Sequence, residues 1–228
     1  IVYRDNGNSS YGTAVVGTVS GTSISFGTPV VFNTANTTDL SVTYDSANDK
    51  VVVAYTDYGN SSYGTALVGE VSGTSISFPS SPVVFESHSS QTQHIASTFD
   101  SANNKVVIVY RAGSPYRGYG IVGTVSGTSI SFGTAVIFES GRAEHPSATF
   151  DSTNNKVVIA YSDQGNSNYG TAVVGTVSGT SISFGTPVVF NTANSVSPSV
   201  TYDPVNDKVV VAYVDYGNNG YGTAIVGE

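Results

Sequence analysis

The pattern of apolar and polar residues repeats along the chain with a period near 52 residues. The period is measured on one tyrosine that ends an apolar run in each repeat, at spacings of 52, 55, 51 and 52 residues: Tyr3, Tyr55, Tyr110, Tyr161 and Tyr213. Each full period holds four stretches rich in Val, Thr, Ile, Phe and Tyr, bounded by Gly, Asn, Asp and Ser. Such stretches are typical of short β-strands. The sequence therefore predicts an all-β repeat protein.

The composition of each stretch predicts its place in a sheet. Residues 41–45 (SVTYD) alternate small and large side chains, which suits an innermost strand. Residues 50–55 (KVVVAY) are apolar after the lysine, as expected of a second strand covered on both faces. Residues 64–69 (GTALVG) follow as the third strand, and residues 75–78 (SISF) alternate polar and apolar side chains as an outermost strand. Prolines then interrupt this fourth strand, which an edge tolerates.

Four antiparallel strands recurring in register are typical of β-propeller blades. The second and third strands occur five times, whereas the first and fourth occur four times each. We therefore predict a five-bladed propeller with incomplete terminal blades. The alternatives are a four-bladed ring with a redundant hairpin, or a piece of a longer array completed by further repeats or a second chain.

The predicted organisation is one propeller domain over residues 1–228. Its repeat units, called the first to fifth units below, span approximately residues 1–39, 40–94, 95–145, 146–197 and 198–228. The longest exact repetition lies in the first and fourth units, where residues 11–36 and 169–194 are identical.

Charge and composition narrow the possible partners. The chain has 16 acidic and 8 basic residues, a formal charge of -8 and a pI near 4.6, which disfavours a nucleic-acid partner. No cysteine is present, so disulfides and thiolate metal sites are excluded. Apolar runs such as residues 51–55 are far shorter than the roughly 20 residues of a membrane span, so we expect no membrane insertion.

The repeats KVVVAYTDYGNSSYGTALVG and SISFGTPVVF, with SVTYDSANDK, resemble the short propeller repeats of microbial and bacteriophage surface or fibre proteins. The overall plan is similar to five-bladed tachylectin-type lectins. The resemblance implies a lectin-like adhesion module that binds a glycan or surface polymer outside the cell, on a cell surface or on a virion.

The first candidate site is the link D-x-G-N-x-x-Y-G between the second and third strands, which occurs four times. A carboxylate, an amide and a phenol close together match the hydroxyls and the C–H face of a neutral sugar. The candidate ligand-binding residues of this link are Asp57, Asn60, Tyr63, Asp163, Asn166 and Tyr169. Tight links use the same residue types for turn formation, so a purely structural role is the alternative.

The second candidate site lies where the repeats diverge. One position at the start of the innermost strand is occupied in turn by Asp39, His94, His145 and Ser197, and we expect these residues around the mouth of a central channel. The neighbouring links contribute the further candidates Arg111, Tyr116, Arg117, Arg142 and Glu144. Arginines could clamp an acidic sugar through forked hydrogen bonds. Sequence drift in solvated links is the alternative.

Catalysis and metal binding have weaker support. Glycosidases need two carboxylates about 5 Å or about 6.5–9.5 Å apart, and Glu86, Glu139 and Glu144 could supply them. His94 and His145 could share a metal ion. The motif D-x-x-N-[DN]-K does not fit a calcium loop and predicts a side-chain-capped hairpin turn. We therefore predict a non-catalytic, multivalent carbohydrate-binding module without a cofactor; a structural propeller and a carbohydrate-active enzyme are the alternatives.

Overall fold

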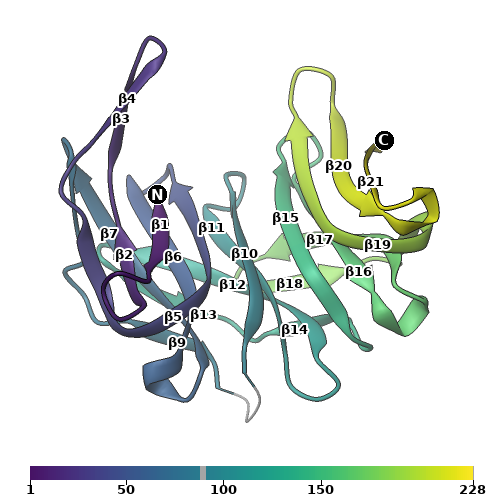
Figure 1. Cartoon of the computed structure of the whole chain (residues 1–228), viewed down its shortest axis with the longest axis horizontal. Helices are drawn as coiled ribbons and strands as arrows, with labels where there is room; N and C mark the ends of the chain where they lie inside the picture. The colour runs from purple at the N-terminus through teal and green to yellow at the C-terminus, as the bar shows by residue number, and fades with distance from the viewer. Residues whose placement is uncertain (88–90, 228) are drawn as a thin grey trace.

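The structure is a computed structural model that describes residues 1–87 and 91–227. These residues form curled antiparallel sheets, which Figure 1 shows side by side in an arc from the N-terminal sheet to the C-terminal sheet. The predicted all-β class is therefore confirmed. No helix of this described part is long and apolar enough to cross a lipid bilayer.

The strands follow the repeat units. The first unit contains β1 (Val2–Asp5), β2 (Tyr11–Ala14), β3 (Gly17–Ser20), β4 (Ser23–Phe26) and the start of β5 (Val30–Asp45). The second contains the end of β5, then β6 (Lys50–Asp57), β7 (Tyr63–Ser72), β8 (Ser75–Ser77) and β9 (Val83–Glu86). The third contains β10 (Gln93–Asp100), β11 (Lys105–Ala112), β12 (Arg117–Ser126), β13 (Ser129–Phe132) and β14 (Val136–Glu139). The fourth contains β15 (Ala143–Asp151), β16 (Lys156–Asp163), β17 (Tyr169–Ser178), β18 (Ser181–Phe184) and the start of β19 (Val188–Asp203). The fifth contains the end of β19, then β20 (Lys208–Asp215) and β21 (Tyr221–Gly227).

The predicted strand order is confirmed within the units. In the third unit β10 pairs with β11, β11 with β12, and β12 with both β13 and β14. The fourth strand is thus split, and its two pieces pair with opposite halves of the third strand. β7 and β17 divide their pairing in the same way.

Two long strands connect neighbouring units. The first half of β5 pairs with β2 and its second half with β6, while β19 joins β17 and β20 in the same manner. The pairing register of the second halves shifts between Thr38 and Ser41 and between Val196 and Ser199. Each shift is a β-bulge, which bends a strand and redirects its side chains.

The second strand is buried on both faces because it packs between two sheets. On β11, Val106, Ile108 and Tyr110 belong to a core shared with the second unit. Val107 and Val109, which point to the opposite face, belong to the core shared with the fourth unit. This packing explains why the strand is apolar at every position instead of alternating.

The hairpins between first and second strands are capped by aspartate, as predicted. The Asp45 carboxylate accepts hydrogen bonds from the backbone N–H groups of Ala47 and Asn48 and from the Asn48 side chain, at 2.8–3.1 Å. Three other units repeat the arrangement at Asp100, Asp151 and Asp203. The D-x-x-N motif is therefore an element of the turn.

Candidate functional site

Four equivalent bulges place one polar residue each in the left-handed backbone region. Asp39, His94, His145 and Ser197 have φ values of 49, 51, 49 and 50°. This region costs most side chains about 1–2 kcal/mol, and short polar residues and histidine occupy it more readily than others. The bulge therefore favours the residue types found there. Asp39, His94 and His145, at the start of the innermost strands of three successive units, are close together.

His94 is at the centre of this group. Its Nε2 is 3.2 Å from a carboxylate oxygen of Glu144, and its Nδ1 is 4.0 Å from the Asp39 carboxylate. The Asp39 carboxylate also accepts a hydrogen bond of 2.7 Å from the His94 backbone N–H. The imidazole rings of His94 and His145 meet with centroids 4.0 Å apart. Three of the four expected positions are therefore joined.

Glu144 is held by two arginines. Arg111 from β11 and Arg142 from the β14–β15 link both form ion pairs with its Oε1. The side chains of Arg111 and Glu144 are buried, whereas the Arg142 side chain is 43% exposed. Arg142 uses its Nε for this contact, and within residues 1–87 and 91–227 its two terminal amino groups make no hydrogen bond or ion pair.

Tyr116 lies against both arginines. Its ring centroid is 5.0 Å from Cζ of Arg111 and 5.1 Å from Cζ of Arg142, which is the geometry of a cation–π contact. Tyr116 lies just before β12 and has a left-handed backbone conformation, with φ of 72°. The ring thus holds the two guanidinium groups side by side.

A chain of hydrogen bonds extends the cluster toward the second unit. Arg111 donates to the side-chain oxygen of Gln93, and Gln93 donates to Gln91 at 2.9 Å. Gln91 in turn donates to the hydroxyl of Tyr58. This chain of hydrogen bonds connects Tyr58, in the repeated link of the second unit, with the divergent cluster.

Burial and charge set the ionisation of the cluster. Burial, then the neighbouring His145 and Arg111, lower the pKa of His94 from 6.5 to about 4. Burial alone would raise the pKa of Glu144, but the hydrogen bond from Arg142 and the charge of Arg111 outweigh it and lower that pKa. At neutral pH the cluster therefore contains a neutral His94, an ionised Glu144 and two cationic arginines.

A polar cleft of about 360 Å³ opens beside the cluster. Arg142, Glu144 and His145 line one side. The other lining residues come from β16, from its link to β17, and from β19: Ser162, Gln164, Asn168, Asn194 and Val196. Sequence inspection did not single out Ser162, Asn168 or Asn194, because each occurs in ordinary repeat sequence. These three residues occupy repeat positions equivalent to residues of the divergent links in the neighbouring unit, and that equivalence could have identified them from the sequence.

Arg117 is separate from the cluster. It begins β12 with an exposed side chain, and this side chain makes no hydrogen bond or ion pair within the described part of the chain. Of the candidates in the divergent links, the structure thus brings together Asp39, His94, His145, Arg111, Tyr116, Arg142 and Glu144.

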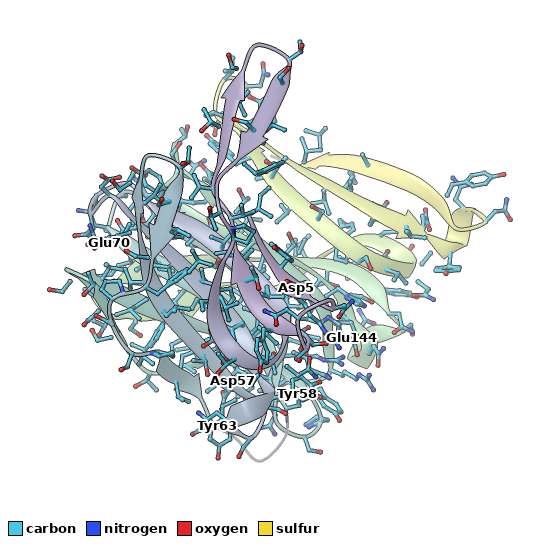
Figure 2. The ribbon with its side chains drawn as sticks, turned by 60° about the vertical axis from the view of Figure 1, so that its left-hand side comes forward. Asp5, Asp57, Tyr58, Tyr63, Glu70 and Glu144 are labelled. Carbon is cyan, nitrogen blue, oxygen red and sulfur yellow. The ribbon has the colours of Figure 1, made fainter. Side chains whose placement is uncertain are left out.

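Three of the four repeated links form short 3-10 turns: η1 (Tyr58–Asn60), η2 (Gln164–Asn166) and η3 (Tyr216–Asn218). Asp57 caps the first through a bond of 2.9 Å from the Gly59 N–H, and Asp163 caps the second through a bond of 3.1 Å from the Asn166 N–H. Figure 2 shows Asp57, Tyr58 and Tyr63 together at one edge of the molecule.

The carboxylates of these links serve the turns, whereas their other candidate side chains are more accessible. Asn60 and Asn166 are exposed, and Tyr63 and Tyr169 are half-buried at the start of β7 and β17. These links are separate in sequence, and the first, second, fourth and fifth units contain one each.

Two of the three glutamates considered for catalysis bind buried tyrosines. Tyr110 donates to Glu86 at 2.9 Å, and Tyr161 donates to Glu139 at 3.1 Å. Glu139 also accepts a hydrogen bond of 2.6 Å from the Gly141 N–H. Both carboxylates occupy the position at which Asn33 and Asn191 occur in other units.

A metal ion would meet mixed chemistry here. His94, Glu144 and His145 offer one ligand atom each within 4.8 Å of one another. However, Arg111 and Arg142 already neutralise the Glu144 carboxylate and would repel a cation. The donor set therefore fits an anion beside the arginines better than a metal ion between the histidines.

Comparison with solved structures shows a likeness of fold. No protein-family model matches the chain, and no curated protein matches it. Among solved structures, the Hadza microbial sialidase Hz136 is similar with a TM-score of 0.54 and 9% sequence identity, over 84% of this chain and 44% of that one. This chain thus corresponds to less than half of the sialidase. The likeness concerns the fold and does not test the resemblance to tachylectin-type lectins.

Proposed function

We propose that this chain is a non-catalytic carbohydrate-binding module whose principal site is the cleft beside Arg142. The observation that supports it most is the Arg142 guanidinium: its terminal amino groups make no hydrogen bond or ion pair within the described residues, and Arg142 lines a cleft together with side-chain amides and the Ser162 hydroxyl. A guanidinium binds a carboxylate through two parallel hydrogen bonds. Amides and hydroxyls pair with sugar hydroxyls as donors and acceptors. The ligand class that matches both is an acidic sugar, such as a uronate or a sialate.

The Arg142 side chain supports an anionic ligand. Arg111 and Arg142 face the ionised Glu144, the Asp39 carboxylate lies on the Nδ1 side of His94, and the pKa of His94 near 4 leaves that imidazole neutral at pH 7. Two arginines and two carboxylates balance, so the attraction for an anion comes from the exposed Arg142 guanidinium and not from an excess of positive charge in the cluster. One exposed guanidinium on a chain whose formal charge is -8 favours a small anion over an extended polyanion such as nucleic acid.

The proposal includes the architecture and the setting. We infer a five-bladed propeller with incomplete terminal blades, located outside the cell on a cell surface or a virion. The likeness to a sialidase and the common pairing of the units support the propeller. Repeated links containing Asn60, Tyr63, Asn166 and Tyr169 would add weak secondary contacts, and avidity makes weak sites sufficient for adhesion.

Two observations bear on the alternatives. The hydrogen bonds from Tyr110 to Glu86 and from Tyr161 to Glu139 assign both carboxylates a structural partner, which supports a non-catalytic role. The use of Asp57 and Asp163 as turn caps favours a purely structural propeller as the second candidate, because those carboxylates are not free for a ligand.

Calorimetric titration with glucuronate, sialic acid and neutral galactose tests the proposal. We expect the acidic sugars to bind in the millimolar range or tighter, and the Arg142→Gln variant to lose about 10-fold or more of that affinity. Arg4→Gln is the matched control, because Arg4 is exposed in the first unit and its side chain donates to Ser10. Equal affinity of the two variants, or no binding of any acidic sugar by the parent chain, would refute the assignment.

A further inference from the structure

An apolar cleft of about 520 Å³ lies between the fourth and fifth units. Val158, Val174, Val188 and Phe190 of the fourth unit line one wall. Val211 and Ile225 belong to the facing wall in the fifth unit. We call this cleft the apolar slot. It is chemically unlike the polar cleft beside Arg142, so it does not belong to the proposed sugar site.

The same place is filled between the other units. There, the hairpin formed by the third and fourth strands of one unit packs a phenylalanine against a phenylalanine of the preceding unit. The ring centroids are 5.6, 5.6 and 5.7 Å apart in the pairs Phe32–Phe78, Phe85–Phe132 and Phe138–Phe184. Phe190 is the equivalent of Phe138, and it lines the slot.

The exposure of equivalent valines shows which side chains the hairpin covers between the other units. Val122 of the third unit is 0% exposed and belongs to the core that includes Ile182, against which Phe184 packs. Its equivalent in the fourth unit, Val174, is 44% exposed, and Val188 is 65% exposed. Within the described residues β21 pairs only with β20. The slot is thus an unfilled copy of a contact that is formed three times elsewhere.

The first unit presents a hairpin without a place to pack. β3 and β4 form a separate two-stranded sheet that projects from the N-terminal end of the arc in Figure 1. Val19, Ile24 and Phe26 on this hairpin are 71%, 51% and 54% exposed. In the identical sequence of the fourth unit, Val177 and Ile182 are 6% and 2% exposed.

We propose that the β3–β4 hairpin of one copy of this chain docks into the apolar slot of a second copy. Ile24 and Phe26 would take the places that Ile182 and Phe184 take against the third unit. The occupant is assigned by sequence identity, since residues 11–36 repeat residues 169–194 without change. A second copy is favoured over the same chain because hairpin and slot lie at opposite ends of the arc in Figure 1.

The contact is heterologous, because the two copies contribute different surfaces. Repetition of such a contact produces either a closed ring or an open filament. Each copy would then present its Arg142 cleft at a fixed spacing from the next.

Sedimentation velocity over a range of protein concentrations tests the docking. We expect the parent chain to associate, and Phe26→Asp and Val188→Asp each to weaken association at least about 30-fold, as for loss of a buried anchor. Both side chains are exposed in the single chain, so folding is retained, which circular dichroism checks. Val205→Asp is the control, since Val205 is 88% exposed on a turn outside the slot.

A mixing experiment separates hairpin from slot. The Phe26→Asp variant keeps an intact slot and Val188→Asp keeps an intact hairpin, so an equimolar mixture is expected to form dimers that grow no further. Failure of the mixture to form dimers, or a monomeric parent chain at all concentrations, would overturn the proposal.

Cross-linking identifies the chain that supplies the hairpin. The chain has no cysteine, so in a Phe26→Cys, Val188→Cys double variant peptide mapping distinguishes a disulfide between positions 26 and 188 from 26–26 and 188–188 pairs. Under oxidation, covalent dimers and larger species are expected. A disulfide formed within one chain would show that the hairpin closes on its own slot, and it would refute docking between copies.

Discussion

Removing the hydroxyl of Tyr110 tests the buried pairing of tyrosine with glutamate. Tyr55, Tyr110 and Tyr161 are equivalent side chains with 0% exposure, one in each of three units. Tyr110 donates to Glu86, which is 4% exposed, whereas the Tyr55 hydroxyl is buried without a hydrogen-bond partner within the described residues. The same substitution, tyrosine to phenylalanine, therefore removes different interactions at equivalent places.

The magnitude follows from the charge and burial of the acceptor. A hydrogen bond to a charged group is worth about 1.5–3 kcal/mol, and Tyr110→Phe removes this bond from a buried acceptor. Burial and the nearby Glu86 raise the pKa of Tyr110, so its hydroxyl remains a donor at any ordinary pH. We expect Tyr110→Phe to lower the free energy of unfolding by about 2–3 kcal/mol. Tyr55→Phe removes an unpaired hydroxyl, and we expect a change within about 0.5 kcal/mol.

Urea denaturation monitored by tyrosine fluorescence and circular dichroism measures both variants. The difference in transition midpoints at unchanged m-value gives the difference in the free energy of unfolding. Tyr161→Phe should be intermediate, because its acceptor Glu139 is only half-buried and is also bonded to Gly141. Equal destabilisation by Tyr110→Phe and Tyr55→Phe would show that ring packing, and not the hydrogen bond, determines the cost.

Three further predictions use equivalent positions and titration. Gly118→Ala should destabilise the fold by about 1–3 kcal/mol, because the added Cβ would lie 2.4 Å from the Phe138 ring. Gly222→Ala, whose Cβ would have no atom within 4 Å, should leave the stability unchanged, and similar melting temperatures of the two variants would contradict this reasoning. The pKa of His94 is about 4 in the folded state and 6.5 in the unfolded state, so the folded state binds fewer protons between these values. The free energy of unfolding should therefore fall as the pH drops from 6.5 toward 4. In denaturation experiments at several pH values, His94→Gln should reduce the slope of the free energy of unfolding against pH. Parallel slopes would refute the role of His94. Asp45→Ala removes three hydrogen bonds at a side chain 1% exposed and should cost about 1–3 kcal/mol by urea denaturation, with no loss contradicting its role as a cap.

Periodicity predicted the strands because local sequence determines where a chain can pair and turn. The apolar run of β11 and the aspartate-capped turns followed directly from residue type. The two copies of the 26-residue repeat show the limit of this reasoning. Residues 169–178 form one continuous strand, whereas the same letters at 11–20 form two strands with a break between them. The difference arises from the neighbouring unit, which covers the hairpin in one copy only.

The candidate site likewise has some features that the sequence predicts and others that it does not. The positions of Asp39, His94 and His145 were predictable, because repeat register aligns them and the bulge then brings them together. The ion pairs of Glu144 with Arg111 and Arg142 were not, since they join side chains from links of different length and composition. Tyr116 was a candidate, but its contact with both guanidinium groups depends on a left-handed backbone that its sequence does not reveal.

The four left-handed bulge residues make the centre of this fold open to redesign. The bulge fixes the backbone at Asp39, His94, His145 and Ser197 alike, whichever residue is present. An acid, two imidazoles and a hydroxyl already occupy these places without altering the pairing around them. Asparagine, aspartate and histidine are the residues best suited to that backbone, and they are also common ligand-binding side chains. Binding specificity can therefore diversify one position at a time, while the surrounding repeats continue to be copied unchanged.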